Sequence, residues 1–341
     1  MEVKYWTRAG LMLTDWCNAA CACCYANCGP AGKTWLDVEA ALKIWQGLIT
    51  ASPHGCRIHL TGGEPFGNFE LLLQVCRQGR QRGLGPLESI ETNGYWAEND
   101  DAIRARLHAL DQQGMGRLVI SADPYHQQYV PIERPQRLAR IAREVLGAER
   151  LRVRWEDWLA GGRDVSPTPE VQERLFLDAY AAAGRDRLTG RATDHLAGSL
   201  PKRPAEAFDG AGCSERLLRG RHVHIAPSGQ VWPATCVGIA IGNALSEELP
   251  HIWERLSHSW RQMEIVQPLC ARGPAGLLER ARATGFRPRA EGYASKCQLC
   301  FDLRRHLIQS PAAPTAGLGP AGVYALEAPP GGAMSRSQGK S

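Results

Sequence analysis

Short apolar runs recur along the first half of the chain and alternate with segments of helical period. They cover residues 11–14, 57–61, 87–92, 117–122 and 151–155. Strand, helix and strand at this spacing are typical of repeated βαβ units, which build a parallel sheet. Five or six units could close most of a barrel. The pattern therefore predicts an α/β fold with a partial (β/α)6 TIM-like barrel, whose chemistry belongs at the carboxyl ends of the strands.

Start signals for helices lie between these runs. Thr34 and Asp37 resemble a capping box ahead of an apolar-periodic stretch. Pro135 and Pro169 stand where a first helical turn would begin, a position that tolerates proline because its missing N–H has no partner there. We therefore expect helices to start at these three places.

The second half of the chain is less regular. A polar stretch rich in Gly and Pro leads to two short strands around a Pro-Ser-Gly turn, then helical segments over 247–267 and 275–285 and a last helix near Cys297. The final residues are mostly Pro, Gly, Ala and Ser, which favours disorder. The predicted division is a barrel over 1–185, a linker over 186–212, a small α+β cluster-binding extension over 213–309 and a disordered tail over 310–341.

Composition and charge narrow the function classes. The net charge of +5 comes from scattered Lys and Arg, which favours solvated helix faces over a nucleic-acid partner. The chain has no run of 18 apolar residues and no signal-peptide pattern at its start, so we expect a cytoplasmic protein without a membrane segment. Twelve cysteines in a reducing compartment indicate metal binding or catalysis rather than disulfides.

The most informative motif is a group of three cysteines just after the first strand. Cys17, Cys21 and Cys24 follow a C-x3-C-x2-C spacing in a loop at the active end of the predicted barrel. Three thiolates can bind three irons of a cubane cluster and leave the fourth iron open, whereas such clusters ordinarily take four Cys. An open coordination position is the mark of a catalytic metal site. The alternative is a zinc knuckle, in which C-x2-C pairs also occur.

This spacing, followed by Thr61-Gly-Gly-Glu-Pro65 after the second strand, resembles the radical SAM superfamily. The resemblance implies that Cys17, Cys21 and Cys24 hold a [4Fe-4S] cluster whose open iron binds S-adenosylmethionine (SAM). One electron, from a donor such as flavodoxin or ferredoxin, would then split SAM into methionine and a 5′-deoxyadenosyl radical. The residue before the third cysteine is usually aromatic in the family and is Cys23 here. Either Cys23 or Cys24 could thus be the ligand, and the spacing favours Cys24.

The turn after the second strand is a candidate SAM site. Gly62 and Gly63 lack side chains, so their backbone can approach a ligand closely. Glu64 can face an ammonium group. The resemblance implies that this segment holds the methionyl amino group of SAM, whereas the alternative is an ordinary turn between a strand and a helix.

Other polar residues end the third, fourth and fifth strands. Asn93, Ser121 and Asp123 would lie at the barrel mouth, where similar enzymes hold the ribose and carboxylate of SAM, or they could cap helices. Arg154 lies on the fifth strand and could pair with the SAM carboxylate.

Three further residues have possible chemistry. His126 and Cys28 are the candidates for a catalytic role, His126 as a substrate contact or proton donor and Cys28 as a thiol near the SAM loop. His59, on a core strand, is better interpreted as a buried histidine with a structural role.

A second cysteine set lies in the C-terminal half and comprises Cys213, Cys236, Cys297 and Cys300. Four thiolates from two strands and a helix would close a metal site fully. The region resembles the SPASM extension, or its shorter twitch form, of peptide-modifying radical SAM enzymes, and Ile241-Gly-Asn-Ala fits that pattern. His306 stands where a further cysteine of the full domain would fall. We therefore expect one auxiliary [4Fe-4S] cluster, with a structural zinc ion as the alternative.

The sequence thus predicts a radical SAM enzyme, an oxidoreductase or transferase, that abstracts hydrogen from a substrate. The extension favours a ribosomally made peptide. The alternatives are a small molecule or RNA, as in cofactor biosynthesis or methylation, and a non-catalytic zinc protein.

Overall fold

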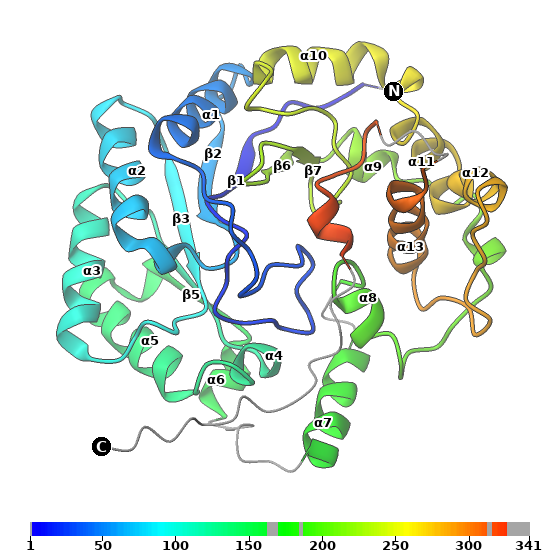
Figure 1. The fold of residues 1–341 in the computed structure, drawn as a ribbon. Coiled ribbons are helices and arrows are strands. Elements are labelled where there is room, and N and C mark those ends of the chain that lie inside the picture. The colour runs from blue at the N-terminus through cyan, green and yellow to red at the C-terminus, as the bar shows by residue number, and fades with distance from the viewer. Residues whose placement is uncertain (1, 162–169, 184–186, 312–315, 326–341) are drawn as a thin grey trace, which may run out of the picture.

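A single seven-stranded sheet organises the computed structural model, which describes residues 2–161, 170–183, 187–311 and 316–325 (Figure 1). The strand order is β5-β4-β3-β2-β1-β6-β7, and every neighbouring pair is parallel except β6 and β7. The strands are β1 (Arg8–Met12), β2 (Arg57–Thr61), β3 (Leu87–Thr92), β4 (Leu118–Ser121), β5 (Leu151–Arg154), β6 (His222–Ile225) and β7 (Val231–Pro233).

The predicted α/β class is confirmed, but the sheet is open and its sixth strand is not where consecutive barrel units would place it. β1 to β5 lie in chain order. β6 comes from the C-terminal half and pairs with the other side of β1, in the register Ala9↔Val223 and Leu11↔Ile225. These four side chains are all buried, so the apolar edge of β1 is covered by β6. The predicted extension therefore shares a sheet with the predicted barrel, and their division into separate units stays a prediction.

One face of the sheet is covered by helices that connect consecutive strands (Figure 1). They are α1 (Val38–Thr50), α2 (Phe69–Gln81), α3 (Asp100–Gln112) and α5 (Glu133–Leu146). Trp45 of α1 is buried against α2 at Gly79, where a β-carbon would lie 2.7 Å from the indole ring. A glycine at this position lets the two helices approach closely.

Each of the first three connecting helices is capped by a short polar side chain. Asp37, Asn68 and Asn99 accept hydrogen bonds from backbone N–H groups of the first turns of α1, α2 and α3. The predicted capping box is thus present only in part, because Thr34 instead donates its hydroxyl to Asp15. Pro135 lies in the first turn of α5 as expected, and Pro169 falls outside the described residues.

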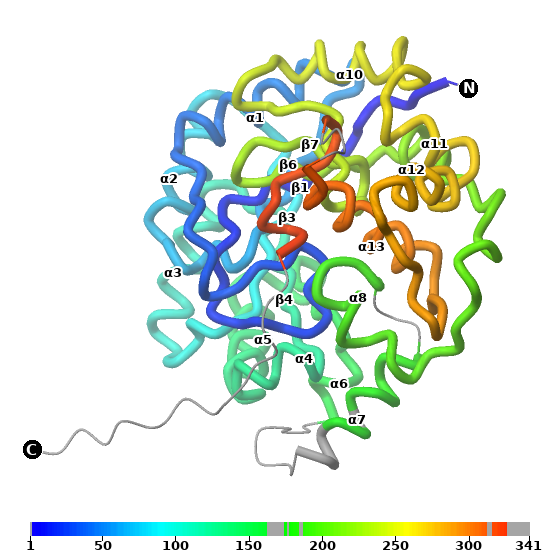
Figure 2. Tube along the Cα trace, turned by 45° about the vertical axis from the view of Figure 1, so that its right-hand side comes forward, coloured from blue at the N-terminus to red at the C-terminus, as the bar shows by residue number. Residues whose placement is uncertain are grey.

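The opposite side of the sheet carries the cysteine loop and the last long helix, α13, whereas α10 packs against α1 (Figures 1 and 2). The remaining α-helices are α4 (Pro124–Gln127), α6 (Glu156–Ala160), α7 (Glu170–Ala182), α8 (Ala192–His195), α9 (Ser214–Leu217), α10 (Leu249–Ser259), α11 (Val266–Arg272), α12 (Leu278–Ala283) and α13 (Lys296–Gln309). The described residues also form short 3₁₀ helices, which are η1 (Pro65–Asn68), η2 (Ala148–Arg150), η3 (Ala205–Phe208), η4 (Trp260–Gln262), η5 (Gly273–Leu277) and η6 (Ala321–Tyr324). No described helix combines the length and apolar character needed to cross a bilayer.

Residues 316–325 are ordered, in contrast to the disordered tail predicted for 310–341. Tyr324 is buried, and its hydroxyl lies 2.6 Å from Nη1 of the buried Arg304 and donates to the carbonyl of Gly238. The side-chain amide of Asn27 donates to the carbonyl of Gly322, so this segment runs beside the cysteine loop (Figure 2). One buried aromatic residue thus anchors a segment of otherwise low hydrophobicity. Residues 312–315 and 326–341 of the predicted tail lie outside the described residues.

Candidate active site

A cavity of about 540 Å³ lies along the face of the sheet opposite the connecting helices. The strands contribute alternate side chains to it, since residues i and i+2 of a strand share a face. These side chains are mostly polar, which distinguishes the cavity from a packed barrel core: His59 and Thr61, Ser89 and Glu91, Val119 and Ser121, Arg152 and Arg154, and His222 and His224. The cysteine loop closes the cavity at the carboxyl ends of the strands.

The cysteine loop is held in place by its own backbone. The N–H of Cys17 donates to the carbonyl of Gly29, and the N–H of Cys24 donates to that of Cys21. Asp15 accepts hydrogen bonds from both the backbone N–H and the hydroxyl of Thr34. These contacts fold residues 13–37 into a loop that presents its thiols to the cavity.

Cys17, Cys21 and Cys24 all line the cavity as free thiols. They lie close enough to interact electrostatically, since Cys21 and Cys24 both raise the pKa of Cys17, although burial is the larger cause. The pKa of Cys24 is lowered to about 5, chiefly by a hydrogen bond from the Cys28 thiol. A thiolate is the form that ligates iron. The three thiols therefore fit an iron–sulfur cluster. Cys24 is already in the thiolate form that a ligand needs, and the Cys28 thiol stabilises that thiolate by its hydrogen bond.

Cys23, the alternative third ligand, also lines the cavity. Its ligating atom is within 4.8 Å of those of Asp123 and His126. Asp123 caps α4, accepting from the N–H groups of Tyr125 and His126, and its second oxygen lies 2.7 Å from Nδ1 of His126. Of the two roles left open for Asp123, the structure shows the cap, while the side chain also lines the cavity.

The imidazole of His126 faces the cluster loop. Burial alone would lower its pKa, but the carboxylate of Asp123, followed by the thiol of Cys21, raises it well above the usual range. His126 is therefore placed to hold a positive charge beside Cys21, a predicted cluster ligand. Such a donor near a thiolate influences the reduction potential of a cluster.

Gly62 and Gly63 allow the turn after β2 to pack closely against the backbone of the cysteine loop. The N–H of Gly63 donates to the carbonyl of Thr14, and that of Glu64 donates to the carbonyl of Trp16, both at 2.7 Å. A β-carbon at Gly63 would lie 1.9 Å from the Trp16 oxygen. The close backbone approach that the sequence indicated is thus made to the cluster loop, while both glycines also line the cavity.

Glu64 has protein donors on both carboxylate oxygens. Oε1 accepts from the Phe66 N–H and the Thr92 hydroxyl, and Oε2 accepts from the Asn93 N–H. The side chain is fully buried, which raises its pKa to about 7. Glu64 therefore joins the ends of β2 and β3 and is not among the residues that line the cavity.

Asn93 connects β3 to the cysteine loop. Its side-chain N–H group donates to Oδ1 of Asn18 at 2.8 Å and lies 3.7 Å from the sulfur of Cys17. Asn93 and Ser121 both line the cavity, as the predicted SAM site requires.

Arg154 lines the cavity and is already paired. Its guanidinium lies 2.7 Å from Glu91, a residue that the sequence did not single out. Three other arginines of the lining, Arg117, Arg152 and Arg187, have no carboxylate partner among the described residues. The cavity therefore offers unpaired positive charge to a ligand.

Arg191 is a further residue that sequence reasoning missed. It lies in the predicted linker, yet it is 6% exposed and donates to the carbonyls of Cys21 and Cys28 and to Oδ1 of Asn27. No sequence signal distinguishes this arginine from the others nearby. The predicted linker therefore contributes Arg191, whose hydrogen bonds to Cys21, Asn27 and Cys28 hold the cysteine loop in place. We call these hydrogen bonds the Arg191 clamp.

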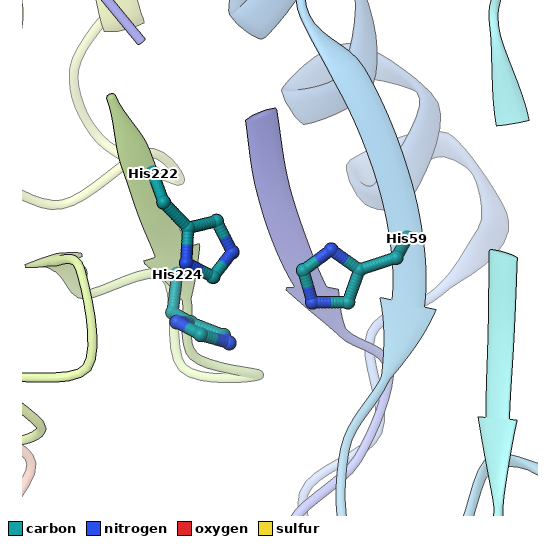
Figure 3. A group of neighbouring side chains, drawn as sticks. All are labelled: His59, His222 and His224. Carbon is teal, nitrogen blue, oxygen red and sulfur yellow. The ribbon is translucent and has the colours of Figure 1, made fainter. Parts of the chain in front are cut away.

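Three histidines meet on the wall of the cavity (Figure 3). His59 extends from β2, and His222 and His224 extend from β6, with β1 between the two strands. Their ligating nitrogens all lie within 4.8 Å of one another. Burial lowers the pKa of His59 and His222 to about 2, so both are neutral. The H-x-H spacing of His222 and His224 in β6 is the sequence signal for this cluster.

The four cysteines of the second set also converge. Cys213 caps α9, Cys236 follows β7, and Cys297 and Cys300 lie in the first turns of α13. Burial and the neighbouring thiols, Cys300 foremost, raise the pKa of Cys213 to about 11 and that of Cys236 to about 12. Among described residues, the three-residue groups with ligating atoms within 4.8 Å include none of these four cysteines. Their thiols are thus spaced more widely than the sulfurs around one zinc ion, which are about 3.8 Å apart.

Comparison with known proteins shows similarities in the N-terminal part of the chain. Residues 7–130, which contain the cysteine loop and the turn after β2, match the family described as a 4Fe-4S single cluster domain. A curated relative, the S-adenosylmethionine-dependent nucleotide dehydratase of Psychrobacter lutiphocae, is 30% identical over 99 residues, or 26% of this chain. The match spans only 33% of that relative's length.

Residues 7–130 are thus similar to a 4Fe-4S single cluster domain, in agreement with the predicted [4Fe-4S] cluster, and the partly similar curated relative is described as S-adenosylmethionine-dependent. The family match ends at residue 130, so the auxiliary cluster stays a prediction.

Solved structures with a similar chain course include BtrN in complex with AdoMet and 2-DOIA, which is 15% identical and aligns over 79% of this chain and 93% of its own with a TM-score of 0.46. SuiB of Streptococcus suis bound to precursor peptide SuiA is 15% identical over 87% of this chain and 77% of its own, also with a TM-score of 0.46. Native anSMEcpe with bound AdoMet is 12% identical over 88% of this chain and 97% of its own, with a TM-score of 0.43.

Proposed function

We propose that this protein is a radical SAM enzyme that abstracts a hydrogen atom from a substrate held in the cavity. The observation that carries the proposal is the meeting of Cys17, Cys21 and Cys24 at one cavity, within the segment that matches a 4Fe-4S domain. When bound, the cluster supplies the electron that cleaves SAM into methionine and a 5′-deoxyadenosyl radical, which takes a hydrogen atom to become 5′-deoxyadenosine.

The chain's own residues hold and orient these groups. Cys17, Cys21 and Cys24 would ligate the cluster. Asn93, Ser121 and Asp123 line the adjacent wall and would contact SAM. Gly62 and Gly63 keep the turn after β2 against the cysteine loop, and Glu64 fixes that turn to β3.

Product formation tests this function directly. Protein reconstituted anaerobically with iron and sulfide, then reduced in the presence of SAM, should release 5′-deoxyadenosine, measured by liquid chromatography and mass spectrometry. Cys17→Ala, Cys21→Ala and Cys24→Ala variants should release none. Cys76→Ala, a buried cysteine of α2 outside the cavity, is the matched control and should keep the activity. Product from all three cysteine variants would contradict the proposal.

For the substrate, we propose an anionic peptide, with a ribosomally made peptide as the preferred source. Arg117, Arg152 and Arg187 supply the unpaired positive charge, and the second cysteine set supports a peptide because it resembles the extension of peptide-modifying enzymes. In an open cavity, each guanidinium can form charge-assisted hydrogen bonds with a carboxylate.

A small anionic molecule is the second candidate, supported by the same arginines and by the partial similarity to a nucleotide dehydratase. Substrate-dependent formation of 5′-deoxyadenosine with acidic peptides and with nucleoside triphosphates separates the two. Arg152→Ala should raise KM at least about tenfold for the true substrate, because a charge-assisted hydrogen bond contributes about 2 kcal/mol. An unchanged KM would exclude Arg152 from substrate binding.

A further inference from the structure

The three histidines on the cavity wall have the geometry of a metal site. The centroids of the imidazole rings are 5.2 Å apart for His59 and His222, 5.5 Å for His59 and His224, and 4.5 Å for His222 and His224. With Zn–N bonds of about 2.0–2.1 Å in tetrahedral geometry, the ring centres of two histidine ligands are about 5 Å apart. The rings therefore already stand at the separation that one shared ion requires.

The strand register creates the space between these rings. Gly10 of β1 is the residue opposite both His59 on β2 and His224 on β6. A β-carbon at Gly10 would lie 2.4 Å from the His224 ring and 2.6 Å from Nε2 of His59. Glycine at this one position lets the side chains of two strands that are not neighbours approach each other across β1.

The hydrogen bonds of the histidines leave nitrogens available. Nδ1 of His224 lies 2.6 Å from the carbonyl oxygen of Ala234, which fixes the proton on Nδ1 and the lone pair on Nε2. Metal-ligating histidines usually hold their second nitrogen in this way. Nδ1 of His59 and Nε2 of His222 are buried and have no hydrogen-bond partner. Such atoms carry a desolvation cost that a bound ion would remove.

Three guanidiniums act electrostatically on the histidines. Arg8 and Arg154 are paired with Glu88 at 2.5 Å and with Glu91 at 2.7 Å, respectively. Arg187, which acts on His222 and His224, lies over the ring of Tyr25. Tyr25, which directly follows the cluster ligand Cys24, places its hydroxyl 3.5 Å from Nε2 of His224. The histidines therefore lie in the same cavity as the cysteine loop and are linked to it through Tyr25.

We propose that His59, His222 and His224 bind one divalent transition-metal ion of the zinc type. Three neutral imidazoles suit zinc and the neighbouring first-row ions, and three protein ligands leave a fourth position open. That position faces the cavity, so a carboxylate or phosphate oxygen of a substrate can occupy it. The ion is separate from both cysteine sets, and it anchors the substrate rather than generating the radical.

Zinc is the probe for the test. Holoenzyme carrying its iron–sulfur cluster is equilibrated with Zn²⁺, freed of excess by gel filtration, and analysed for zinc and iron by mass spectrometry. We expect one tightly held zinc per chain beyond the iron. His59→Asn and His222→Asn should weaken zinc binding at least about tenfold without lowering iron content. His108→Asn, on the exposed face of α3, is the matched control and should bind zinc like the unaltered protein.

X-ray absorption at the zinc edge of the unaltered protein provides a readout that needs no variant to fold. Nitrogen and oxygen neighbours alone, with the imidazole scattering pattern, would support the site. Sulfur neighbours, zinc binding that persists in both histidine variants, or failure of the unaltered protein to retain zinc would overturn it.

Discussion

Nε of Arg191 donates a hydrogen bond to the carbonyl oxygen of Cys21 at 2.9 Å, so a residue from the C-terminal side of α7 fixes the middle of the cluster loop. The same guanidinium reaches Asn27 and the carbonyl of Cys28. A single buried cation therefore holds three points of a loop that contains little regular secondary structure.

Arg191→Ala should destabilise the loop. Removing the guanidinium leaves buried carbonyls without donors, and we expect a loss of about 3 kcal/mol in the free energy of unfolding. Iron bound after reconstitution should fall, and the cluster absorbance should bleach faster in air. Arg219→Ala, which removes an exposed arginine, is the control. Equal iron content and bleaching rate in the two variants would refute the clamp.

Gly63→Ala should displace the cysteine loop from β2. The added β-carbon would meet the Trp16 carbonyl at 1.9 Å, and overpacking of this kind costs about 1–3 kcal/mol. The melting temperature and the iron content should both fall. Gly198→Ala is a matched control because a β-carbon there meets nothing within 4 Å. Normal iron loading in Gly63→Ala would show that the turn and the loop move independently.

Cys24 should be a more acidic thiol than Cys17. With a pKa of about 5, it is a thiolate at pH 7, whereas burial keeps Cys17 protonated. Anaerobic apoprotein treated briefly with iodoacetamide should therefore be alkylated at Cys24 before Cys17, as mass spectrometry of its peptides can show. Cys28→Ala removes the hydrogen-bond donor and should slow alkylation of Cys24 at pH 6. Cys76→Ala should leave it unchanged, and faster labelling of Cys17 would contradict the assignment.

The Asp123–His126 pair should give the apoprotein a pH-dependent stability. Because folding raises the pKa of His126, its contribution is complete below the unfolded value near 6.5 and is lost as pH rises through the folded value. Asp123→Asn keeps a capping oxygen but removes the charge. The free energy of unfolding should fall by about 2 kcal/mol at pH 6 and lose this pH slope, as denaturant titrations from pH 6 to 9 can measure. An unchanged slope would show that the pair is not coupled.

Cys297→Ala tests the second cysteine set. If the four thiols hold an auxiliary cluster, this variant should lose about half of its iron and still cleave some SAM. Zinc replacing iron in the unaltered protein would favour the structural alternative. Cys56→Ala, at a buried cysteine outside both sets, should keep all its metal.

The pattern of apolar and polar residues predicted the strands, because strand formation depends on residues that are close in the sequence. The runs at 57–61 and 87–92 match β2 and β3 to the residue, because alternating buried positions and flanking turns define a strand. The pattern could not predict that β6 pairs with β1. The backbone of any exposed strand edge offers the same hydrogen-bonding groups, so these groups alone do not select a partner. The partner is selected by burial of Val223 and Ile225.

Site residues show the same division. The cysteine spacing indicated the loop directly, but the neighbours of its residues depended on long-range packing. Both carboxylate oxygens of Glu64 accept hydrogen bonds from Phe66, Thr92 and Asn93. No local sequence pattern predicts these partners. Arg191 and Tyr324 reach their sites from segments whose composition indicated a linker and a tail.

The pairing of β6 with β1 also determines when the cavity can exist during synthesis. An emerging chain can pair β1 to β5 early, but the wall that carries His222 and His224 is absent until the ribosome has passed them. The contacts of Asn27 with Gly322 and Ala325 come later still. Contacts between such distant segments form slowly because a long loop must close first. The cysteine loop therefore lacks its contacts with Gly322 and Ala325 until those residues have left the ribosome, long after its own thiols have emerged.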